Sequence, residues 1–516
     1  MNILRIESYK RGMVFSSLFN IGSKALTFFQ SIVIAYYFGA QAGTDVFFYC
    51  LSAIGFISSY FVSVNQAVLI PEAMRISIQD NKGKSIRFLN FFLLLYVLIS
   101  LLVILILYMS PIKTFLLISR FDQGVLQSNA EIILLAIPLL FLMNLSSVLV
   151  DILTSYKFFT MPMVASMTYS SFALVFIFAF HNVLAIASII IGLLVGYSVN
   201  VVVLLALLKT KVEWEFKVGG VSIGWRNWKN LILIQLGNIT TTLGSYLPLY
   251  LISGFNTGVV TALNYGQRVS NIPDQLITTQ VSQVSAIKFN ELYALRQFSK
   301  LNDAFVEAAS FLMFFFIPIS FILFQFSPEI IKLLYQRGAF DPKSVMITSE
   351  FLKYFGLTLP FVALNTLSTR LMMAGQKIKA SFFSQIVVNV IFLVLLCYLV
   401  GRIGPLGYPL SVVLYLPISV LPYNFFLFRV LFPELAYWRV IRNFLLITLV
   451  NVAVSAPIYF LIRVGFEGAL FLFLSVFYYF VVVIVINYRF TISEQTKELS
   501  RLTINRLIVT LHYGFS

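Results

Sequence analysis

The sequence predicts an all-α polytopic membrane protein with about 14 transmembrane helices, arranged as two pseudo-symmetric six-helix bundles plus a C-terminal helix pair. Apolar stretches separated by short polar loops fill most of the chain, and about 20 apolar residues suffice to cross roughly 30 Å of hydrocarbon. Hydrophobic residues make up 59% of the chain and charged residues 11%, far from the composition of a soluble domain. The expected spans are residues 13–37, 46–70, 88–110, 131–153, 161–180, 184–208, 229–252, 259–285, 304–326, 346–374, 380–400, 406–428, 440–462 and 467–487.

The basic residues of the loops indicate the orientation. If the N-terminus is cytoplasmic, the cytoplasmic loops and tails, together with Lys229 and Arg442 at the cytoplasmic ends of their spans, hold 25 of the 36 Lys and Arg residues, and the opposite side holds seven. This asymmetry follows the positive-inside rule and places both termini in the cytoplasm. The net charge of +16 is therefore explained by topology and by attraction to anionic lipid headgroups, without a nucleic-acid partner.

Few residues of the chain suit catalysis or metal binding. Cys50 and Cys397 lie inside or at the edge of spans, where a disulfide framework is not expected. His181 and His512 lie in different segments, so no metal site and no cofactor are predicted. The sequence also lacks a Walker loop, a Rossmann glycine motif and a nucleophile elbow, so an ATP-driven pump is not favoured unless a partner supplies the ATPase.

Two segments resemble each other and favour an internal repeat, with chance composition as the alternative. Residues 38–49 and 254–265 both place a turn of small residues before an apolar run that contains aromatic residues. Copies of an even-span unit share their orientation, so the repeats would be parallel. We therefore predict a first six-helix bundle over 1–210, a second over 211–432, and a final helix pair with a cytoplasmic tail over 433–516.

Charged residues inside spans are expensive and commonly functional. Lys24 lies midway along the first span, where snorkelling to the interface would be strained. Arg268 lies in the eighth span among polar neighbours, and we expect it to line a hydrated cavity, with Pro273 kinking the helix. A buried ion pair is the alternative, although Asp274, six residues on, lies on a different helical face.

Other polar residues in the spans are more ambiguous. Asp45 lies at the outer mouth of the second span, where it binds substrate or simply caps the start of the helix. Four charged residues near span ends are expected to snorkel or to pair in loops: Asp151, Glu350, Lys353 and Arg370. Uncharged polar groups suggest a hydrated interior: Gln30, Asn65, Gln66, Gln235, Asn238, Asn365 and Asn389.

Isolated cations with few acids in the spans favour an anionic substrate. Arg binds phosphate oxygens through paired hydrogen bonds, and Lys acts as a mobile point charge. A drug exporter for cations would need carboxylates within the membrane, and these are scarce. From the residues alone, we predict a membrane transporter for something negatively charged.

Three segments resemble the MurJ (MviN) family of lipid II flippases. The most specific is Leu-Leu-Tyr-Gln-Arg-Gly-Ala-Phe-Asp at 333–341, followed by Leu-Lys-Tyr-Phe-Gly-Leu at 352–357. The others are Ser-Lys-Ala-Leu-Thr-Phe-Phe-Gln at 23–30, leading into Thr-Asp-Val-Phe-Phe at 44–48, and Ala-Leu-Asn-Tyr-Gly-Gln-Arg-Val-Ser-Asn-Ile-Pro at 262–273. The resemblance extends over nearly the whole chain.

This resemblance implies membership of the multidrug/oligosaccharidyl-lipid/polysaccharide exporter superfamily, whose members alternate between inward-open and outward-open states. It implies transfer of a polyprenyl-diphosphate-linked sugar across the bacterial inner membrane, driven by membrane potential or an ion gradient. Arg268 matches the family's span-8 arginine, Lys24 stands where span 1 usually has arginine, and Asp45 matches the span-2 acid. The substrate site expected on this basis comprises Arg268, Lys24, Gln30, Asp45, Asn264, Gln267, Asn271 and Gln235, and the last two spans would guide the lipid tail.

Departures from the family pattern keep the substrate open. Gln30 replaces a second span-1 arginine, and Ser52, Ser58 and Ser59 stand where span 2 commonly has arginines. A flippase for lipid II therefore stands beside a flippase for a lipid-linked capsule, exopolysaccharide or O-antigen oligosaccharide. A drug or cation antiporter and a membrane glycan polymerase are less favoured. Membrane lipids and enzymes of cell-wall or polysaccharide assembly are the expected partners.

Overall fold

The computed structural model describes residues 9–217, 239, 241–466 and 468–490, and these residues form helices and connecting turns without a β-strand. Eleven helical stretches among them are long and apolar enough to cross a membrane, which confirms the predicted all-α membrane fold. One stretch, Lys379–Leu431, contains two of the expected spans. Part of the expected span 229–252 lies outside the described residues, and the expected span 259–285 is helical.

The chain folds into two compact units. Unit 1 comprises Met1–Thr261 and Arg337–Ser344, and unit 2 comprises Ala262–Gln336 and Val345–Ser516. The short segment 337–344 thus belongs by its contacts to unit 1, although the chain on either side of it belongs to unit 2. The division into two six-helix bundles and a final pair stays a prediction.

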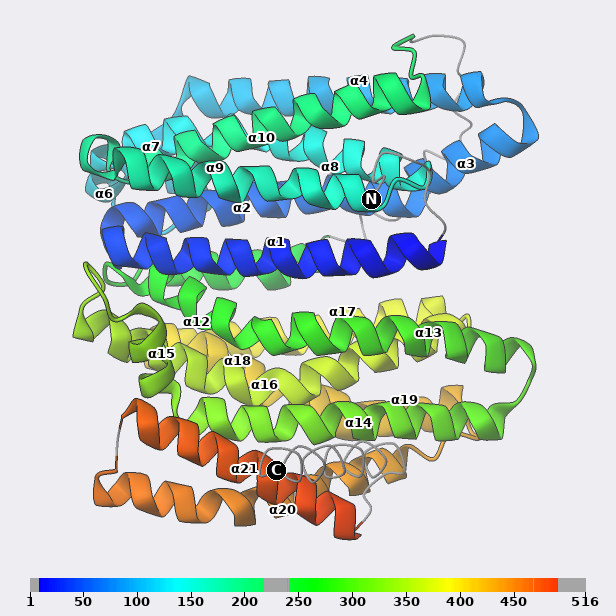
Figure 1. Cartoon of the computed structure of the whole chain (residues 1–516), viewed down its shortest axis with the longest axis vertical. Coiled ribbons are helices and arrows are strands. Elements are labelled where there is room, and N and C mark those ends of the chain that lie inside the picture. Colours follow the sequence, from blue (N-terminus) through cyan, green and yellow to red (C-terminus); the bar gives the residue numbers. More distant parts are fainter. Residues whose placement is uncertain (1–8, 218–238, 240, 467, 491–516) are drawn as a thin grey trace, which may run out of the picture. The chain divides into compact units, whose positions relative to one another are not determined.

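Unit 1 contains long helices that run side by side (Figure 1). Its elements are α1 (Tyr9–Phe38), α2 (Ala42–Val64), the π-helical turn η1 (Asn65–Leu69), α3 (Ile70–Gln79), α4 (Lys82–Met109), α5 (Pro111–Ile118), α6 (Gln123–Ser128), α7 (Ala130–Ala136), α8 (Leu139–Ser155), α9 (Thr160–Leu184), α10 (Ala187–Leu207), the π-helical turn η2 (Leu208–Val212) and a helix over 241–252. Helix α8 packs against α2, α4 and α10, and its buried side chains contribute to the apolar core of the unit. The α2, α4 and α8 helices therefore share one interior.

Close backbone packing joins α9 and α10. Gly192 and Gly196 are spaced as in the small-residue motif that lets transmembrane helices approach each other. A Cβ at Gly192 would lie 2.6 Å from the Cα of Ala173 on α9, and a Cβ at Gly196 would overlap the Cα of Tyr169. Only glycine fits at these two positions without displacing a backbone.

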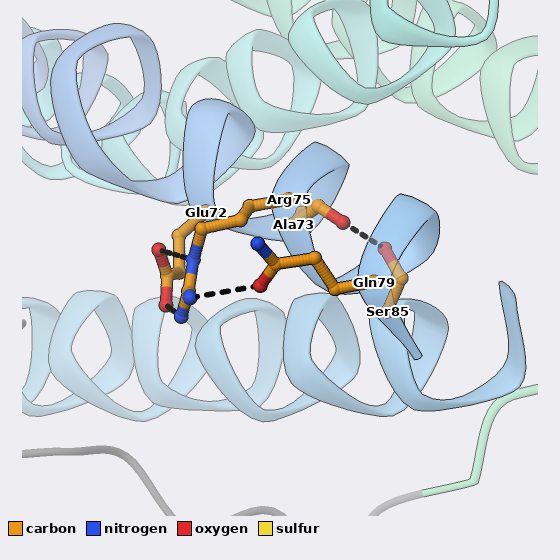
Figure 2. Close-up of polar contacts among 5 residues, drawn as sticks. All are labelled: Glu72, Ala73, Arg75, Gln79 and Ser85. Atoms are coloured by element: carbon orange, nitrogen blue, oxygen red, sulfur yellow. Dashed lines mark hydrogen bonds and ion pairs between the residues drawn. The ribbon is translucent and has the colours of Figure 1, made fainter. Parts of the chain in front are cut away.

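Helix α3 is fastened to α4 by polar contacts (Figure 2). The Ser85 hydroxyl on α4 donates to the backbone oxygen of Ala73 on α3 at 2.6 Å. On α3, the Arg75 guanidinium donates to both carboxylate oxygens of Glu72, at 2.5 and 2.9 Å, and to the Gln79 side chain at 3.0 Å. This hairpin places the charged groups at the end of the expected second span.

The segment that follows η2 folds back onto α4. The buried amide of Asn90 accepts a hydrogen bond from the Trp214 indole at 2.8 Å. Its NH₂ group donates to the backbone oxygens of Glu215, at 2.6 Å, and Lys217, at 3.0 Å. Because Trp214 is itself buried in the core, residues 212–217 form part of unit 1.

Unit 2 is also built from helices. Its elements are α12 (Val259–Pro273), whose first residues belong to unit 1, then the π-helical turn η3 (Asp274–Thr278), α13 (Thr279–Ala294), α14 (Phe298–Gln325), α15 (Ser327–Tyr335), α16 (Pro342–Ala374), α17 (Ile378–Ile403), the 3₁₀ turn η4 (Gly404–Leu406), α18 (Gly407–Ile418), the π-helical turn η5 (Ser419–Tyr423), α19 (Asn424–Leu431), α20 (Tyr437–Val464) and α21 (Ala469–Phe490). The last two helices pack on α14, and the Tyr479 hydroxyl on α21 donates to the Asn451 side chain on α20 at 2.9 Å.

Three helices, α8, α13 and α16, have the same kind of cap at their C-terminal ends. Lys157 after α8, Arg296 after α13 and Gln376 after α16 have φ values of 65°, 54° and 54°. In each, the amide of the next residue donates to the carbonyl five residues back, the pattern of a Schellman cap. Glycine is the usual residue in such caps, so these three non-glycine residues adopt a backbone conformation that their side chains disfavour.

Candidate functional site

Polar side chains form one stripe along α12. Asn264, Gln267, Arg268 and Asn271 are spaced at i, i+3, i+4 and i+7, which brings them onto a single helical face. Asn264, Gln267 and Arg268 are half-buried, and Asn271 is exposed. The structure therefore brings together the four site residues that were predicted in this segment.

The opposite face of α12 packs into unit 2. The Tyr265 ring stacks on Tyr335 with centroids 4.7 Å apart, and a Cβ at Gly266 would lie 2.8 Å from the Cβ of Phe351 on α16. The glycine lets the two helices approach closely, which fixes the rotation of α12 about its axis. On the stripe itself, the Gln267 NH₂ group donates to the Tyr408 hydroxyl at 3.1 Å.

The stripe ends where the helix changes type. α12 ends at Pro273, and the π-helical turn η3 follows immediately, with Thr279 donating its amide to the Asp274 carbonyl. Proline removes a backbone donor, and a π-helical turn widens the helix locally. We expected Pro273 to kink the helix. What the structure shows at this point is a change from α-helical to π-helical hydrogen bonding directly after the proline.

Asp45 has a different environment from the stripe. It is 2% exposed in the first turn of α2, and its carboxylate accepts bonds from the Gly258 amide at 2.6 Å and the Thr261 amide at 2.7 Å. The Thr261 hydroxyl donates a third bond at 2.6 Å. Gly258 has a φ of 91°, which turns the chain into α12. Asp45 therefore caps the start of α12 rather than of its own helix, where Gln41 and Thr44 form the capping box.

Lys24 and Gln30 both lie on α1, and the structure does not bring them onto one face. Six residues correspond to about 240° of rotation along an α-helix. Lys24 is half-buried and forms no ion pair with the residues that the structure describes. Gln30 is buried. Gln235 lies outside the described residues.

The Gln-Arg-Gly-Ala-Phe segment packs on the turn between α1 and α2. The Ala339 amide donates to the Tyr36 carbonyl at 2.8 Å. Gly338 and Gly39 have φ values of 60° and 59°, and a Cβ on either would overlap the carbonyl oxygen of Tyr36 or Ala339, respectively. The sequence identified this segment as a family signature but did not predict that it packs on the turn between α1 and α2. The two glycines, Gly39 and Gly338, are the sequence feature that could have indicated this close backbone contact.

A polar pair between the buried Asn65 and the half-buried Asp151 was missed. Asp151 on α8 was expected to snorkel or to pair in a loop, and instead its carboxylate accepts a hydrogen bond from the Asn65 amide at 3.0 Å, inside unit 1. Of the other charged residues near span ends, Lys353 does pair with Glu350, at 3.5 Å within α16. The Asp151 expectation was wrong because its partner is distant in sequence, 86 residues away.

Comparison with known proteins places these features in a family. The family model for the lipid II flippase MurJ matches residues 34–481. A protein of Borreliella burgdorferi named "Probable lipid II flippase MurJ" is 24% identical over 379 residues, which cover 72% of this chain and 73% of that protein. A protein of the same name from Thermotoga maritima is 22% identical over 399 residues, covering 75% and 78%.

Solved structures agree in fold. The chain is similar to a structure described as lipid II flippase MurJ in an inward closed conformation, with a TM-score of 0.79, 20% identity and coverage of 92% of this chain and 98% of the other. An inward-facing MATE-family multidrug transporter of the MOP superfamily gives a TM-score of 0.65 at 12% identity, covering 80% and 95%. Because the family match spans most of the sequence and the fold agrees with it, this multi-pass membrane protein belongs to the MurJ lipid II flippase family.

Proposed function

We propose that this protein transports lipid II, a polyprenyl-diphosphate-linked peptidoglycan precursor, from the cytoplasmic to the outer leaflet of the inner membrane by alternating access. The observation that carries the proposal is the family match over residues 34–481. The Arg268 stripe supports it, because a guanidinium flanked by amides on one helical face can bind a diphosphate and its attached sugars. Both termini lie in the cytoplasm, as the basic residues of the loops indicate.

Each site residue has a distinct role in this proposal. Arg268 and Lys24 bind the diphosphate oxygens. Gln30, Asn264, Gln267, Asn271 and Gln235 form hydrogen bonds with the sugars. The carboxylate of Asp45 is occupied by the start of α12, so its contribution is to position the helix that carries Arg268. The apolar surface of α20 and α21 accompanies the lipid tail, and cell-wall assembly enzymes supply and consume the substrate.

Complementation tests the proposal. The gene is expressed in a bacterium depleted of its own lipid II flippase, together with Arg268→Ala, Arg268→Lys and a control, Arg402→Ala, at an exposed position at the end of α17. Wild type and the control should restore growth and should expose lipid II to an externally added enzyme that cleaves it. Arg268→Ala should do neither, and Arg268→Lys should retain partial function because it keeps the charge but not the paired hydrogen bonds. Rescue by Arg268→Ala would contradict the role of this residue.

A second substrate class is favoured by the neutral residues of unit 1. Gln30 and Ser58 are buried uncharged side chains at positions where the resemblance implies arginines. A flippase for another lipid-linked oligosaccharide would fit this weaker positive charge. Failure of well-expressed, membrane-inserted wild type to restore growth, with restored export of capsule, exopolysaccharide or O-antigen in a strain lacking that flippase, would select this alternative.

A further inference from the structure

Three helical elements of unit 1, η1, α4 and α8, carry polar side chains that lie close to the Asp151 carboxylate. Asn65, at the start of the π-helical turn η1, donates its amide to the Asp151 carboxylate on α8 at 3.0 Å. The side chain of the neighbouring Gln66 lies close to the same carboxylate. Tyr96 on α4 lies within electrostatic reach of the same carboxylate. These residues play no part in the proposed binding of the lipid-linked sugar.

Two oxygen atoms of this cluster find no hydrogen-bond partner among the residues that the structure describes. Asn65 is 0% exposed and its Oδ1 accepts no bond, and Tyr96 is 6% exposed and its hydroxyl makes none. The Tyr96 ring packs edge-on against Phe61, with centroids 4.8 Å apart, which holds the hydroxyl in place. Buried polar atoms are nearly always satisfied. One unsatisfied oxygen belongs to the residue that bonds Asp151, and the other belongs to the ring that packs on Phe61, one helical turn before Asn65, so both require a partner that the described protein atoms do not supply. The π-helical turn at Asn65 adds to this argument, since such turns occur frequently at functional sites.

The charges and the ligand atoms define what would fit. Among the residues that the structure describes, no Lys or Arg forms an ion pair with Asp151. A single carboxylate with neutral oxygens matches a hard monovalent cation, whereas sites for Ca²⁺ commonly use several carboxylates. Transition metals prefer His or Cys ligands, and the described part of the chain has no cluster of three or more His, Cys, Asp and Glu suited to a metal. A proton on Asp151 would neutralise the charge but leave the other oxygens unsatisfied.

We propose that Asp151, Asn65 and Tyr96 form a Na⁺ site in unit 1. The ion accepts lone pairs from a carboxylate oxygen, from Asn65 Oδ1 and from the Tyr96 hydroxyl oxygen, and it bridges η1, α8 and α4. Occupancy stabilises the packing of these three elements against one another. The site uses none of the substrate residues, so Na⁺ binding can be measured independently of whether lipid II is the substrate.

The test is thermal unfolding of the purified full-length protein in lipid nanodiscs. NaCl is titrated against choline chloride and KCl at constant ionic strength. A ligand that binds only the folded state raises the melting temperature as its concentration increases beyond Kd. We expect Na⁺ to raise the melting temperature of wild type and choline to leave it unchanged, with K⁺ much weaker than Na⁺.

Variants assign the response to the cluster. Asp151→Asn keeps the shape and can still accept the Asn65 bond, and it should abolish the Na⁺ response. Tyr96→Phe keeps the ring packing and should raise the Kd for Na⁺ about tenfold. Glu350→Gln changes a carboxylate of unit 2 that pairs with Lys353 within α16, and this variant should respond as wild type does. A Na⁺ response that persists in Asp151→Asn would overturn the proposal. So would a wild type that ignores Na⁺, including one whose stability depends on pH alone.

Discussion

Replacing Asp45 with alanine removes a buried carboxylate that accepts three hydrogen bonds from the start of α12. Asp45 is 2% exposed, so water cannot readily replace the lost acceptor. The Gly258 amide and both donors of Thr261 would lose their partner. Hydrogen bonds to charged groups contribute about 1.5–3 kcal/mol each, and the bonds are not independent, so we expect roughly 3–5 kcal/mol of local destabilisation.

Hydrogen exchange measures this directly. Because each 1.4 kcal/mol is about a tenfold change in an equilibrium, the amides of Gly258 and Thr261 should exchange about 100-fold or more faster in Asp45→Ala. Thr261→Val keeps the side-chain shape, loses one of the three bonds and should cost about 1.5 kcal/mol. In the Asp45→Ala background the same Thr261→Val change should cost almost nothing, because its acceptor is already gone. Unchanged exchange at both amides in Asp45→Ala would refute the capping role.

Three further predictions concern stability. Gly196→Ala should destabilise the protein by about 1–3 kcal/mol in thermal unfolding, because the added Cβ would collide with the backbone of α9. The control Gly55→Ala has open space around the added Cβ, and it should be neutral or stabilising by up to about 1 kcal/mol. Asn90→Ala loses its three bonds to the 212–217 segment and should make that segment several-fold more sensitive to limited proteolysis. Asp341 lies outside the spans, and hydrogen bonds from the Ser344 side chain and the Ser344 amide, in the first turn of α16, hold the pKa of its carboxyl below the usual range. The stability that this carboxylate contributes is therefore present above about pH 4 and is lost as the pH falls further. Wild type and Asp341→Asn should accordingly differ in melting temperature at pH 7 and converge in acid.

Much of the fold follows from local features of the sequence. Hydrophobic length alone predicts spans that coincide with observed helices: the expected 346–374 lies within α16, and 440–462 lies within α20. The i, i+3, i+4, i+7 spacing likewise predicts that Asn264, Gln267 and Arg268 share a face, because helical geometry is fixed once the helix is predicted. Local chemistry is sufficient for such features.

Features that depend on distant partners could not be predicted in this way. Asp45 could be recognised as a capping residue, but the helix that it caps begins more than 200 residues later. The sequence likewise gives no reason to pair Asn65 with Asp151, because hydropathy treats both as isolated polar residues near span ends. The contact of Ala339 with Tyr36 is carried by main-chain atoms, which any sequence would supply. What the sequence offers there is the pair of glycines that make room.

The position of Asp45 has a consequence for the proposed transport. The boundary between the two compact units falls inside α12, between Thr261 and Ala262, so the start of this helix belongs with Asp45 and the stripe belongs to unit 2. Arg268 lies seven residues beyond Thr261, about 10 Å along the helix axis. A rigid helix transmits a displacement of its first turn over that distance, whereas a loop would absorb it. Loss of the cap should therefore impair transport without any contact between Asp45 and the substrate, and substrate affinity measured by direct binding should fall less than the transport rate.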